Sequence, residues 1–404
     1  MIAGLKELEG GTVASTPGFL AAGISSGIKS GNKKDLALVA SDVDCEVGAT
    51  FTTNQIKAAP VRLSAQHSKR GTCRAVIINS GCANACTGIK GITDAKSMAE
   101  TTASELKTTK SKILVCSTGG IGHLLPMDKV TSGIRKAAHS LKEKYGTLAA
   151  KAIMTTDTFH KEHAVSFLID GKRVTIGAMA KGAGMIHPNM ATMLCVVTTD
   201  AHIDKVTLQK CTHNAVEETF NRISVDGDTS TNDSVLVLAN GLAKNNKLRK
   251  GHAQVNRFQQ ALTQVMQVLA RMIIEDGEGI TKVVELHVKG ANSTSDAKKH
   301  AEAIACSPLV KCAWAGHDPN WGRIVAAMGY SGARIREELI DIYYDGVAAT
   351  KGGLVTKTPL SKLRKIARKR NYTITIDLNI GKGQYNLLTN DFTEEYVKIN
   401  RAYE

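Results

Sequence analysis

Two continuous apolar runs separated by a helical pattern constrain the fold of this chain more than any other feature of its sequence. CRAVIINSG (73–81) and KILVCSTG (112–119) predict short strands that end in Gly or Ser turns. Because these runs are apolar throughout, we expect both faces of each strand to be covered. TDAKSMAETTASELK (93–107), which lies between them, predicts a helix. The pattern favours a layered architecture in which helices cover sheets.

The same alternation continues to the end of the chain. Further strands are expected at 34–42, 174–180, 194–203, 283–288, 340–345 and 372–379. Helices are expected from Asp204, as N-cap, through Phe220, and at 255–274 and 295–305. A chain of 404 residues exceeds one compact domain, and the pattern predicts a boundary near residue 290, with a main domain 1–290 and a C-terminal domain 291–404.

Bulk composition narrows the class of protein. The N-terminus lacks a basic start followed by an apolar run, and the chain has no apolar stretch of about 18 residues, so we expect no signal peptide, no membrane partner and a cytoplasmic location. Nine cysteines do not fit a closed disulfide framework, so reduced, buried thiols are expected. Cys82 and Cys86 have metal-like spacing, but no second pair completes a site, so no metal is expected.

The formal charge of +15 favours anionic partners. The basic segment 361–370 carries Leu363, Ile366 and Ala367 at helical spacing, which predicts a surface helix with a solvated basic face. Aromatic residues for base stacking are not interleaved with the basic residues, so we expect no nucleic-acid partner.

A match to the esterase pattern G-x-S-x-G occurs at residues 23–27. A nucleophile elbow requires a strand before the serine and a helix after it. The flanking sequence shows no clear strand, so the match is interpreted as chance.

The segment KGAGMIHPNMATML (181–194) has the features that self-cleavage requires. Gly182 and Gly184 permit a close backbone approach, and a small residue, Ala191, precedes Thr192 ahead of an apolar strand. The Thr192 hydroxyl could attack the Ala191 carbonyl, after which the new α-amine, with a pKa of about 7.7–8.0, would serve as its base. Ala-Thr before a strand is also an ordinary structural sequence.

CSTGGIGH (116–123) places small residues and backbone N–H groups at a strand end, which suits either an oxyanion hole or a simple Gly turn. DPNWGRI (318–324) is interpreted as scaffolding around a site in preference to direct substrate contact. DGDTSTNDS (226–234) fits a polar-ligand site and a Gly/Asp turn equally well.

Together, these motifs resemble the glutamate N-acetyltransferase/ornithine acetyltransferase family of arginine biosynthesis. The resemblance covers nearly the whole chain and rests on eight segments in order: TTNQIKAAPV, STGGIG, IMTTDT, KGAGMIHPNMATMLCVVTTDA, DGDTSTNDS, EDGEG, DPNWGRI and YVKIN. It implies an α/β (α+β layered) fold, with helices packed on mixed sheets in an αββα-like arrangement and a smaller C-terminal α/β domain.

The resemblance also implies a role for each matching residue. Self-cleavage between Ala191 and Thr192 gives an α chain, 1–191, and a β chain, 192–404, in which Thr192 is the nucleophile. Thr118 and Gly119 form the oxyanion hole. The expected substrate contacts are Thr155, Lys181, Thr192, Glu278 and Asn400.

The implied reaction is ping-pong transfer of an acetyl group from N-acetylornithine to glutamate, without a cofactor. Acetyl-CoA as a second donor stays open, and two copies of each fragment are expected to form a heterotetramer. An aminopeptidase or amidase on a related self-processing fold is the alternative. Two departures from the family pattern are Cys82, where Asn is usual, and the lack of the usual hydroxyl residue after Asn400.

Overall fold

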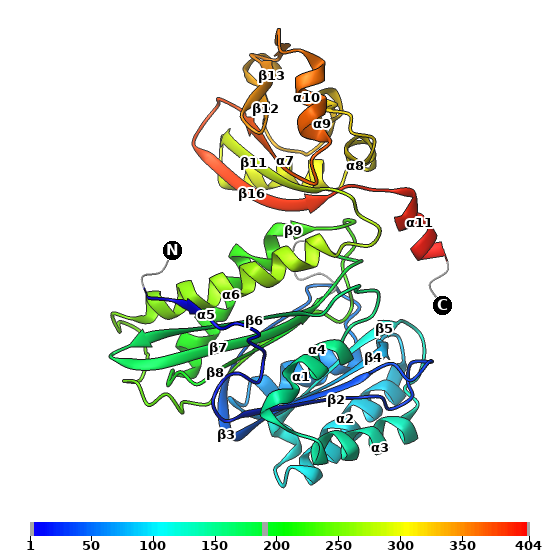
Figure 1. Cartoon of the computed structure of the whole chain (residues 1–404), viewed down its shortest axis with the longest axis vertical. Helices are drawn as coiled ribbons and strands as arrows, with labels where there is room; N and C mark the ends of the chain where they lie inside the picture. The colour runs from blue at the N-terminus through cyan, green and yellow to red at the C-terminus, as the bar shows by residue number, and fades with distance from the viewer. Residues whose placement is uncertain (1–3, 188–192, 402–404) are drawn as a thin grey trace. The chain divides into compact units, whose positions relative to one another are not determined.

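The two continuous apolar runs form neighbouring strands, the last two in the order of one sheet. β4 (Thr72–Cys82) and β5 (Ile113–Gly120) pair in parallel, and α2 (Gly88–Glu105) connects them. A parallel pair requires such a crossover, so the strand–helix–strand prediction is confirmed. Figure 1 shows the two strands and the helix as consecutive elements of one unit.

The computed structural model describes residues 4–187 and 193–401. The chain divides into two units, which are described separately. The larger unit comprises Met1–Gly182, Asn189–Asn221 and Thr229–Ile273, and the smaller one comprises Ala183–Pro188, Arg222–Asp228 and Ile274–Glu404. The boundary predicted near residue 290 falls inside strand β11 (Val283–Ala291) of the smaller unit.

The larger unit contains a mixed sheet, with nine strands among the described residues. Its order is β1 (Lys6–Glu7), β6 (Lys161–Ile169), β7 (Lys172–Lys181), β8 (Leu194–Thr199), β10 (Ser234–Ala239), β3 (Leu36–Phe51), β4 and β5, and β2 (Phe19–Ile24) pairs with β3. β7 and β8 are antiparallel, and Lys181 pairs with Leu194. This pairing aligns the end of β7 with the start of β8, the strand that follows Thr192 in sequence.

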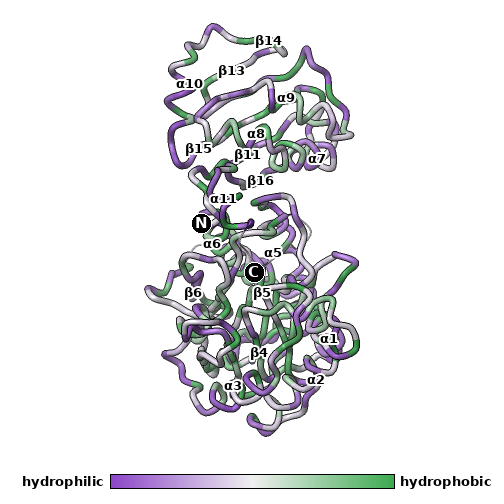
Figure 2. Tube along the Cα trace, turned by 90° about the vertical axis from the view of Figure 1, so that its right-hand side faces the viewer, coloured by the Kyte–Doolittle hydropathy of each residue, from purple (hydrophilic) through white to green (hydrophobic). Residues whose placement is uncertain are grey.

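Both faces of β4 are covered, as its apolar run predicted. Ile77 of β4 belongs to the same buried cluster as Met98 of α2, and Ile78 belongs to a second cluster with Ala149 of α4 (Gly146–Ala152). Figure 2 shows the trace as largely hydrophobic along β4. Because successive side chains point to opposite faces, an uninterrupted apolar run is needed here.

The helices predicted at 93–107, 204–220 and 255–274 are present in the larger unit, together with further helices that were not predicted. The helices of this unit are α1 (Ala59–Ser68), α2, α3 (Met127–His139), α4, α5 (Lys205–Glu218) and α6 (Val255–Glu275), which contains the boundary at Ile273. Short 3-10 turns occur at Lys110–Lys112, Glu143–Tyr145 and Phe220–Arg222. Asp204 caps α5 as predicted, because its carboxylate accepts the N–H of Thr207.

The smaller unit has its own mixed sheet and core. Its strands are ordered β14 (Leu354–Val355), β13 (Val347–Lys351), β12 (Asp341–Tyr344), β15 (Asn371–Asp377), β11, β16 (Gly383–Asn390) and β9 (Ile223–Ser224). The helices are α7 (Thr294–Ala305), α8 (Pro308–Ala315), α9 (Trp321–Gly329), α10 (Leu360–Ala367) and α11 (Glu394–Arg401), with a 3-10 turn at Glu337–Leu339. The expected α/β class, with helices on mixed sheets, is confirmed.

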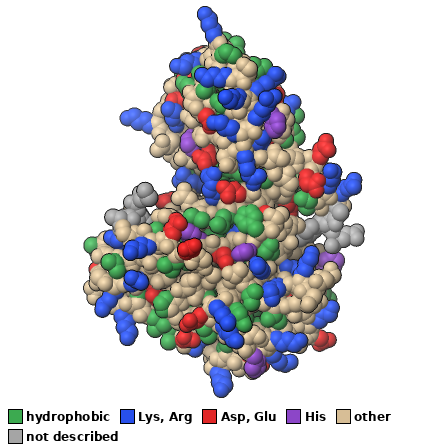
Figure 3. All heavy atoms as spheres, in the orientation of Figure 1, with side chains coloured by type: hydrophobic (Ala, Val, Ile, Leu, Met, Phe, Trp, Pro, Cys, Tyr) green, Lys and Arg blue, Asp and Glu red, His purple; other side chains and the backbone are tan. Residues whose placement is uncertain are grey.

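The basic segment 361–370 lies mostly on the surface. Leu363, Ile366 and Ala367 of α10 are buried, whereas Arg364 and Lys365 are exposed, so the predicted amphipathic surface helix is confirmed. Figure 3 shows Lys and Arg side chains spread over the visible face of the molecule. Within the described residues, no helix combines the length and the apolar character that crossing a membrane requires.

Candidate active site

Three of the predicted site residues meet at the end of β7. Lys181, the last residue of that strand, is 3% exposed. Its Nζ donates to Oγ1 of Thr155 at 2.7 Å and to Oγ1 of Thr118 at 3.4 Å. Thr118 lies on β5 and Thr155 follows α4, so three segments that are distant in sequence converge on one ammonium group. The structure therefore brings together Thr118, Thr155 and Lys181.

Asp157 organises this cluster, and the sequence analysis did not select it. Its carboxylate accepts the N–H of Thr155 at 2.9 Å and the N–H of Gly182 at 2.8 Å. Nζ of the fully buried Lys161 donates to the same carboxylate at 2.7 Å, and Nζ of Lys181 lies 4.0 Å away. The signal was present in the sequence, because Asp157 belongs to IMTTDT and lies four residues before Lys161.

The charges of Lys161, Lys181 and Asp157 give this cluster a net positive charge. Burial alone would raise the pKa of Asp157, but Lys181 and Lys161 outweigh burial and lower that pKa to about 2. The carboxylate is therefore ionised at neutral pH and is matched by two lysines. This arrangement favours a further negative charge nearby, such as a substrate carboxylate or a developing oxyanion.

Lys29 is a second group that the sequence analysis missed. Its Nζ donates to the carbonyl of Met154, the residue before Thr155, and to the carbonyl of Lys34 at 3.2 Å. Burial, together with the charge of Lys181, lowers the pKa of Lys29 to about 8, although the charge of Asp35 opposes this shift. Its local sequence, IKSGNKK, carries no motif, so only the fold reveals that Lys29 belongs to this cluster.

The backbone conformation and the close surroundings of Gly119 exclude a side chain at this position. Gly119 has a φ of +130°, and a Cβ there would lie 2.4 Å from the carbonyl carbon of Gly81 on β4. Ser117 anchors the same strand end, because its carbonyl accepts Nδ2 of Asn232 at 2.8 Å. The strand end that carries Thr118 and Gly119 is thus held in one conformation.

The predicted cleavage site, Ala191 and Thr192, lies outside the described residues. The residues that follow it are described. The N–H of Met193 donates to Oδ1 of Asp233 at 2.8 Å, and Leu194 pairs with Lys181. The chain that leaves Thr192 therefore begins β8 beside the residue on which the cluster is centred.

The other two predicted residues contact each other in the smaller unit. Oε2 of Glu278 accepts Nδ2 of Asn400 at 2.8 Å. The N–H of Glu278 donates to the carbonyl of Ala183 at 3.0 Å, and a Cβ on Gly184 would lie 2.5 Å from the Glu278 carboxylate. A side chain at position 184 would displace the Glu278 carboxylate, so the K-G-A-G-M segment packs tightly against Glu278.

The esterase-like match at residues 23–27 differs from its prediction in one respect. β2 (Phe19–Ile24) precedes it, so the expectation that no strand lies there was wrong. Residues 25–35, all of which the structure describes, contain no helix. The N–H and Oγ of Ser26 donate to Oδ1 of Asp35 at 2.6 and 2.8 Å. Asp35 therefore organises this loop, and the nucleophile elbow is not formed.

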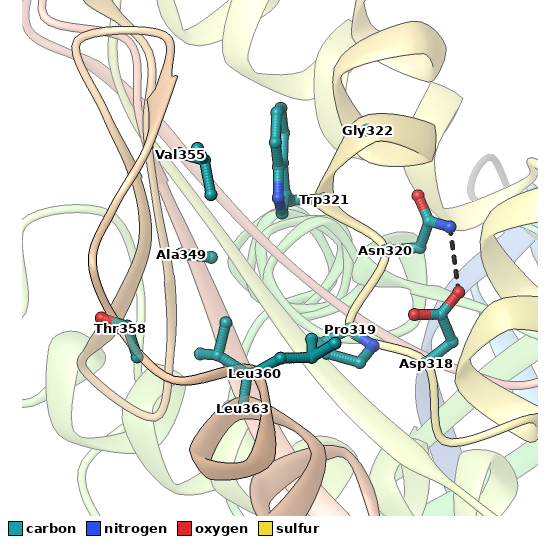
Figure 4. Close-up of a pocket in the computed structure, with 10 residues that line it drawn as sticks. All are labelled: Asp318, Pro319, Asn320, Trp321, Gly322, Ala349, Val355, Thr358, Leu360 and Leu363. Carbon is teal, nitrogen blue, oxygen red and sulfur yellow. Dashed lines mark hydrogen bonds between the residues drawn. The ribbon is translucent and has the colours of Figure 1, made fainter.

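Residues 318–322 of the DPNWGRI segment line a cavity of about 430 Å³ within the smaller unit. Figure 4 shows the Trp321 ring, Leu360 and Val355 around this cavity. Asn320 caps α9 by accepting the N–H of Arg323 at 3.1 Å, and its Nδ2 donates to Asp318 at 2.9 Å. These contacts support a structural role for Asn320.

Comparison with known proteins extends these observations to the whole chain. The model of the ArgJ family matches residues 20–404. A protein named "Arginine biosynthesis bifunctional protein ArgJ" from Caldanaerobacter subterraneus subsp. tengcongensis is 47% identical over 401 residues, which are 98% of this chain and 99% of that protein. The protein of the same name from Symbiobacterium thermophilum is 47% identical over 395 residues, covering 97% and 98% of the two chains.

A solved structure is also similar in sequence. The crystal structure of the arginine biosynthesis bifunctional protein ArgJ from Bacillus halodurans is 41% identical. The match covers 51% of this chain and 97% of that chain, with a TM-score of 0.49. On the match to the family model and the identity to relatives of the same length, this chain belongs to the ArgJ family.

Proposed function

We propose that this protein is an acyltransferase of arginine biosynthesis that moves an acetyl group from N-acetylornithine to glutamate. In this proposal the chain first cuts itself between Ala191 and Thr192, and Thr192 then carries the acetyl group. Membership of the ArgJ family supports the proposal, as do the names of the relatives. The observation that most supports it is the contact of Lys181 with Thr118 and Thr155 beside the start of β8.

Self-cleavage needs no outside reagent except water. The Thr192 hydroxyl attacks the Ala191 carbonyl, and the peptide nitrogen of Thr192 leaves, so that an ester replaces the amide. Water then hydrolyses the ester, which leaves a carboxylate on Ala191 and an amine on Thr192. This amine, with an ordinary pKa of about 7.7–8.0, acts as the base for the adjacent hydroxyl.

Transfer follows in two half-reactions. The Thr192 oxygen attacks the acetyl carbonyl of N-acetylornithine, and the α-nitrogen of ornithine leaves with the proton held by the Thr192 amine. The α-amine of glutamate then attacks the acetyl ester and regenerates the Thr192 hydroxyl. In both tetrahedral intermediates, Thr118 and Gly119 stabilise the oxyanion.

The charges of the described residues suit these substrates. The two lysines that share Asp157 leave a surplus positive charge, which favours an α-carboxylate near Lys181 and Thr155. The carboxylate of Glu278, paired with the Asn400 amide, suits the side-chain ammonium of ornithine. Glutamate and ornithine have the α-carboxylate in common, so one positive centre serves both half-reactions.

The test combines intact mass with an activity assay. Purified wild-type protein should give two fragments, the second beginning with Thr192. It should release more than one equivalent of ornithine per active site from N-acetylornithine only when glutamate is present. Thr192→Ala should stay whole and inactive, whereas Thr192→Ser keeps the hydroxyl and should still cut. Full-rate hydrolysis without glutamate would favour the amidase alternative. The same assay with acetyl-CoA as donor decides whether a second acetyl source is used.

A further inference from the structure

A group of buried polar side chains connects the backbones of β4 and β5 close to Thr118 and Gly119. The group consists of Asn79, Ser117, Thr231 and Asn232, each of which is 8% exposed or less. All of them belong to the larger unit. The proposed chemistry uses Thr118 and Gly119 but gives this group no role. Two of its members, Thr231 and Asn232, belong to DGDTSTNDS (226–234), whose role the sequence leaves open between a ligand site and a turn.

The pairing of the two strands becomes irregular at this point. It is regular as far as Gly81 and Gly119, and then Cys82 faces both Thr118 and Gly120. Such an irregularity bends a strand and redirects its groups, and it is common next to active sites. A Cβ on Gly119 would lie 2.4 Å from the carbonyl carbon of Gly81 and 2.5 Å from the nitrogen of Cys82, so the two backbones touch. Because regular pairing ends here, other contacts must fix the end of β5.

The Asn79 amide supplies one of these contacts. Its Nδ2 donates to the carbonyl of Cys82 at 2.8 Å, and its Oδ1 accepts the hydroxyl of Ser117 at 2.5 Å. Asn79 is fully buried, so its amide must find its partners within the protein. The amide therefore ties the irregular part of β4 to the residue directly before Thr118.

The Asn232 amide supplies a second bridge. Its Nδ2 donates to the carbonyl of Ala83, which follows β4, at 2.6 Å and to the carbonyl of Ser117 at 2.8 Å. Oγ1 of Thr231 donates to Oδ1 of Asn232 at 2.5 Å, which fixes the orientation of the amide. The nitrogen and the oxygen of both amides are thus hydrogen-bonded, and a buried polar network that is satisfied in this way makes the backbone around it rigid.

We propose that Asn79 and Asn232 are positioning residues for the oxyanion hole, which hold the end of β5 in the conformation that lets Thr118 and Gly119 stabilise the oxyanion. Such a donor is effective only when it lies about 2.7–3.1 Å from the place that the oxyanion will occupy, so a small shift of the strand end lowers the rate. This inference rests on the proposed function. Because one oxyanion hole serves both half-reactions, loss of either amide should slow both.

The experiment measures each half-reaction separately by the mass of the fragment that begins with Thr192. N-acetylornithine alone should acetylate this fragment, and glutamate added afterwards should remove the acetyl group. Asn79→Ala and Asn232→Ala should lower the limiting rates of both steps, per cleaved chain, by about tenfold or more. The substrate concentrations that give half of each limiting rate should change by less than about twofold, because the oxyanion forms only in the transition state.

Asn245→Ala is the matched control. Asn245 is a buried asparagine of the same unit, and its Nδ2 also donates to two backbone carbonyls, those of His202 and Asn246. β8 begins beside Lys181, whereas His202 follows its other end, so the control lies away from the proposed site. Asn245→Ala should lower the temperature of thermal unfolding about as much as Asn232→Ala does, yet leave both limiting rates unchanged.

Smaller changes test the orientation of each amide. Thr231→Val removes the hydroxyl that bonds Asn232 and keeps the shape of the side chain, so both limiting rates should fall by about two- to tenfold. Thr231→Ser keeps the hydroxyl and should retain the wild-type rates within about twofold. Ser117→Ala removes the hydroxyl that bonds Asn79 and should act as Thr231→Val does. If an asparagine-to-alanine variant is unfolded, these variants decide for the amide concerned.

The outcomes distinguish this inference from the proposed function. If the wild type transfers acetyl groups and the folded Asn79 and Asn232 variants are as fast as Asn245→Ala, the positioning role is wrong while the proposed function stands. If only one half-reaction slows, the amides act on one substrate and not on a shared oxyanion hole, which also overturns the inference. If the wild type acquires no acetyl group from N-acetylornithine, the proposed function fails and this inference fails with it.

Discussion

Asp157 in the larger unit and Asp226 in the smaller one both accept backbone N–H groups, but their pKa values shift in opposite directions. Asp157 accepts the N–H groups of Thr155 and Gly182, and Asp226 accepts those of Met185, Ile186 and Asp228. Lysines flank Asp157, and its pKa falls to about 2, whereas burial raises the pKa of Asp226 to about 6. Backbone N–H donors are therefore not enough to offset burial at Asp226, and the nearby lysines decide the direction of the pKa shift at Asp157.

The largest expected effect comes from neutralising the carboxylate that the lysines surround. Asp157→Asn leaves two lysine ammonium groups, one of them fully buried, without their shared anion. We expect the free energy of unfolding at pH 7.5 to fall by about 3–5 kcal/mol, measured by urea denaturation. Asp226→Asn, which leaves no such pair behind, should lose about 1 kcal/mol or less. An equal decrease in the free energy of unfolding of the two variants would contradict the proposed difference between Asp157 and Asp226.

The second prediction concerns Lys181, one of the two lysines that lower the pKa of Asp157. Lys181→Met should lower kcat/KM for both substrates by about 100-fold, since a charge-assisted hydrogen bond to a carboxylate contributes roughly 1.5–3 kcal/mol. The pKa of Asp157 should move upward, toward that of Asp226. Lys172→Met, at the exposed opposite end of β7, is the control and should leave the kinetics unchanged. A normal kcat/KM in Lys181→Met would exclude Lys181 from substrate binding.

The fold and the candidate site were not equally predictable from the sequence. The β4–α2–β5 unit was predictable, because continuous apolar runs and a helical period are local signals that packing then satisfies. Thr118, Thr155 and Lys181 were reached through motif resemblance, and the fold brings them together. Lys29 was not predictable, because its role depends on a contact with Met154 that only the tertiary fold creates. Asp157 had a signal in its motif, but its burial beside Lys161 did not follow from it.

The third prediction uses the pH dependence of stability. The pKa of Asp226 is raised in the folded state, so between about pH 4 and pH 6 the folded protein binds more protons than the unfolded chain. The free energy of unfolding of the wild type, relative to Asp226→Asn, should therefore fall as pH rises through this window, by about 1–3 kcal/mol. Asp157 has the opposite sign, because its stabilisation is lost as pH falls from about 4 toward 2.

Urea denaturation of the wild type and Asp226→Asn at pH 4.5 and pH 7.5 measures the difference directly. Asp228→Asn serves as the control, because it changes a carboxyl in the same motif that is exposed to solvent. If the difference in the free energy of unfolding between the wild type and Asp226→Asn is the same at both pH values, burial does not raise the pKa of Asp226.

The smallest expected effect concerns Lys29, which adds to the positive field around Lys181. With a pKa of about 8, Lys29 loses its proton as pH rises from 7 to 9, so the attraction for a substrate carboxylate weakens. KM for glutamate should rise by about two- to fivefold over that range.

The Thr192 amine titrates in the same pH range, but its deprotonation activates the nucleophile and so changes kcat. Lys29→Gln should therefore remove the rise in KM and keep the change in kcat. Lys34→Gln, a lysine of the same loop that donates to the carbonyl of Gly23, should keep both. A rise in KM that persists in Lys29→Gln would show that the titration of Lys29 does not cause it, and would leave Lys181 and Lys161 as the sources of the positive field that separates the surroundings of Asp157 from those of Asp226.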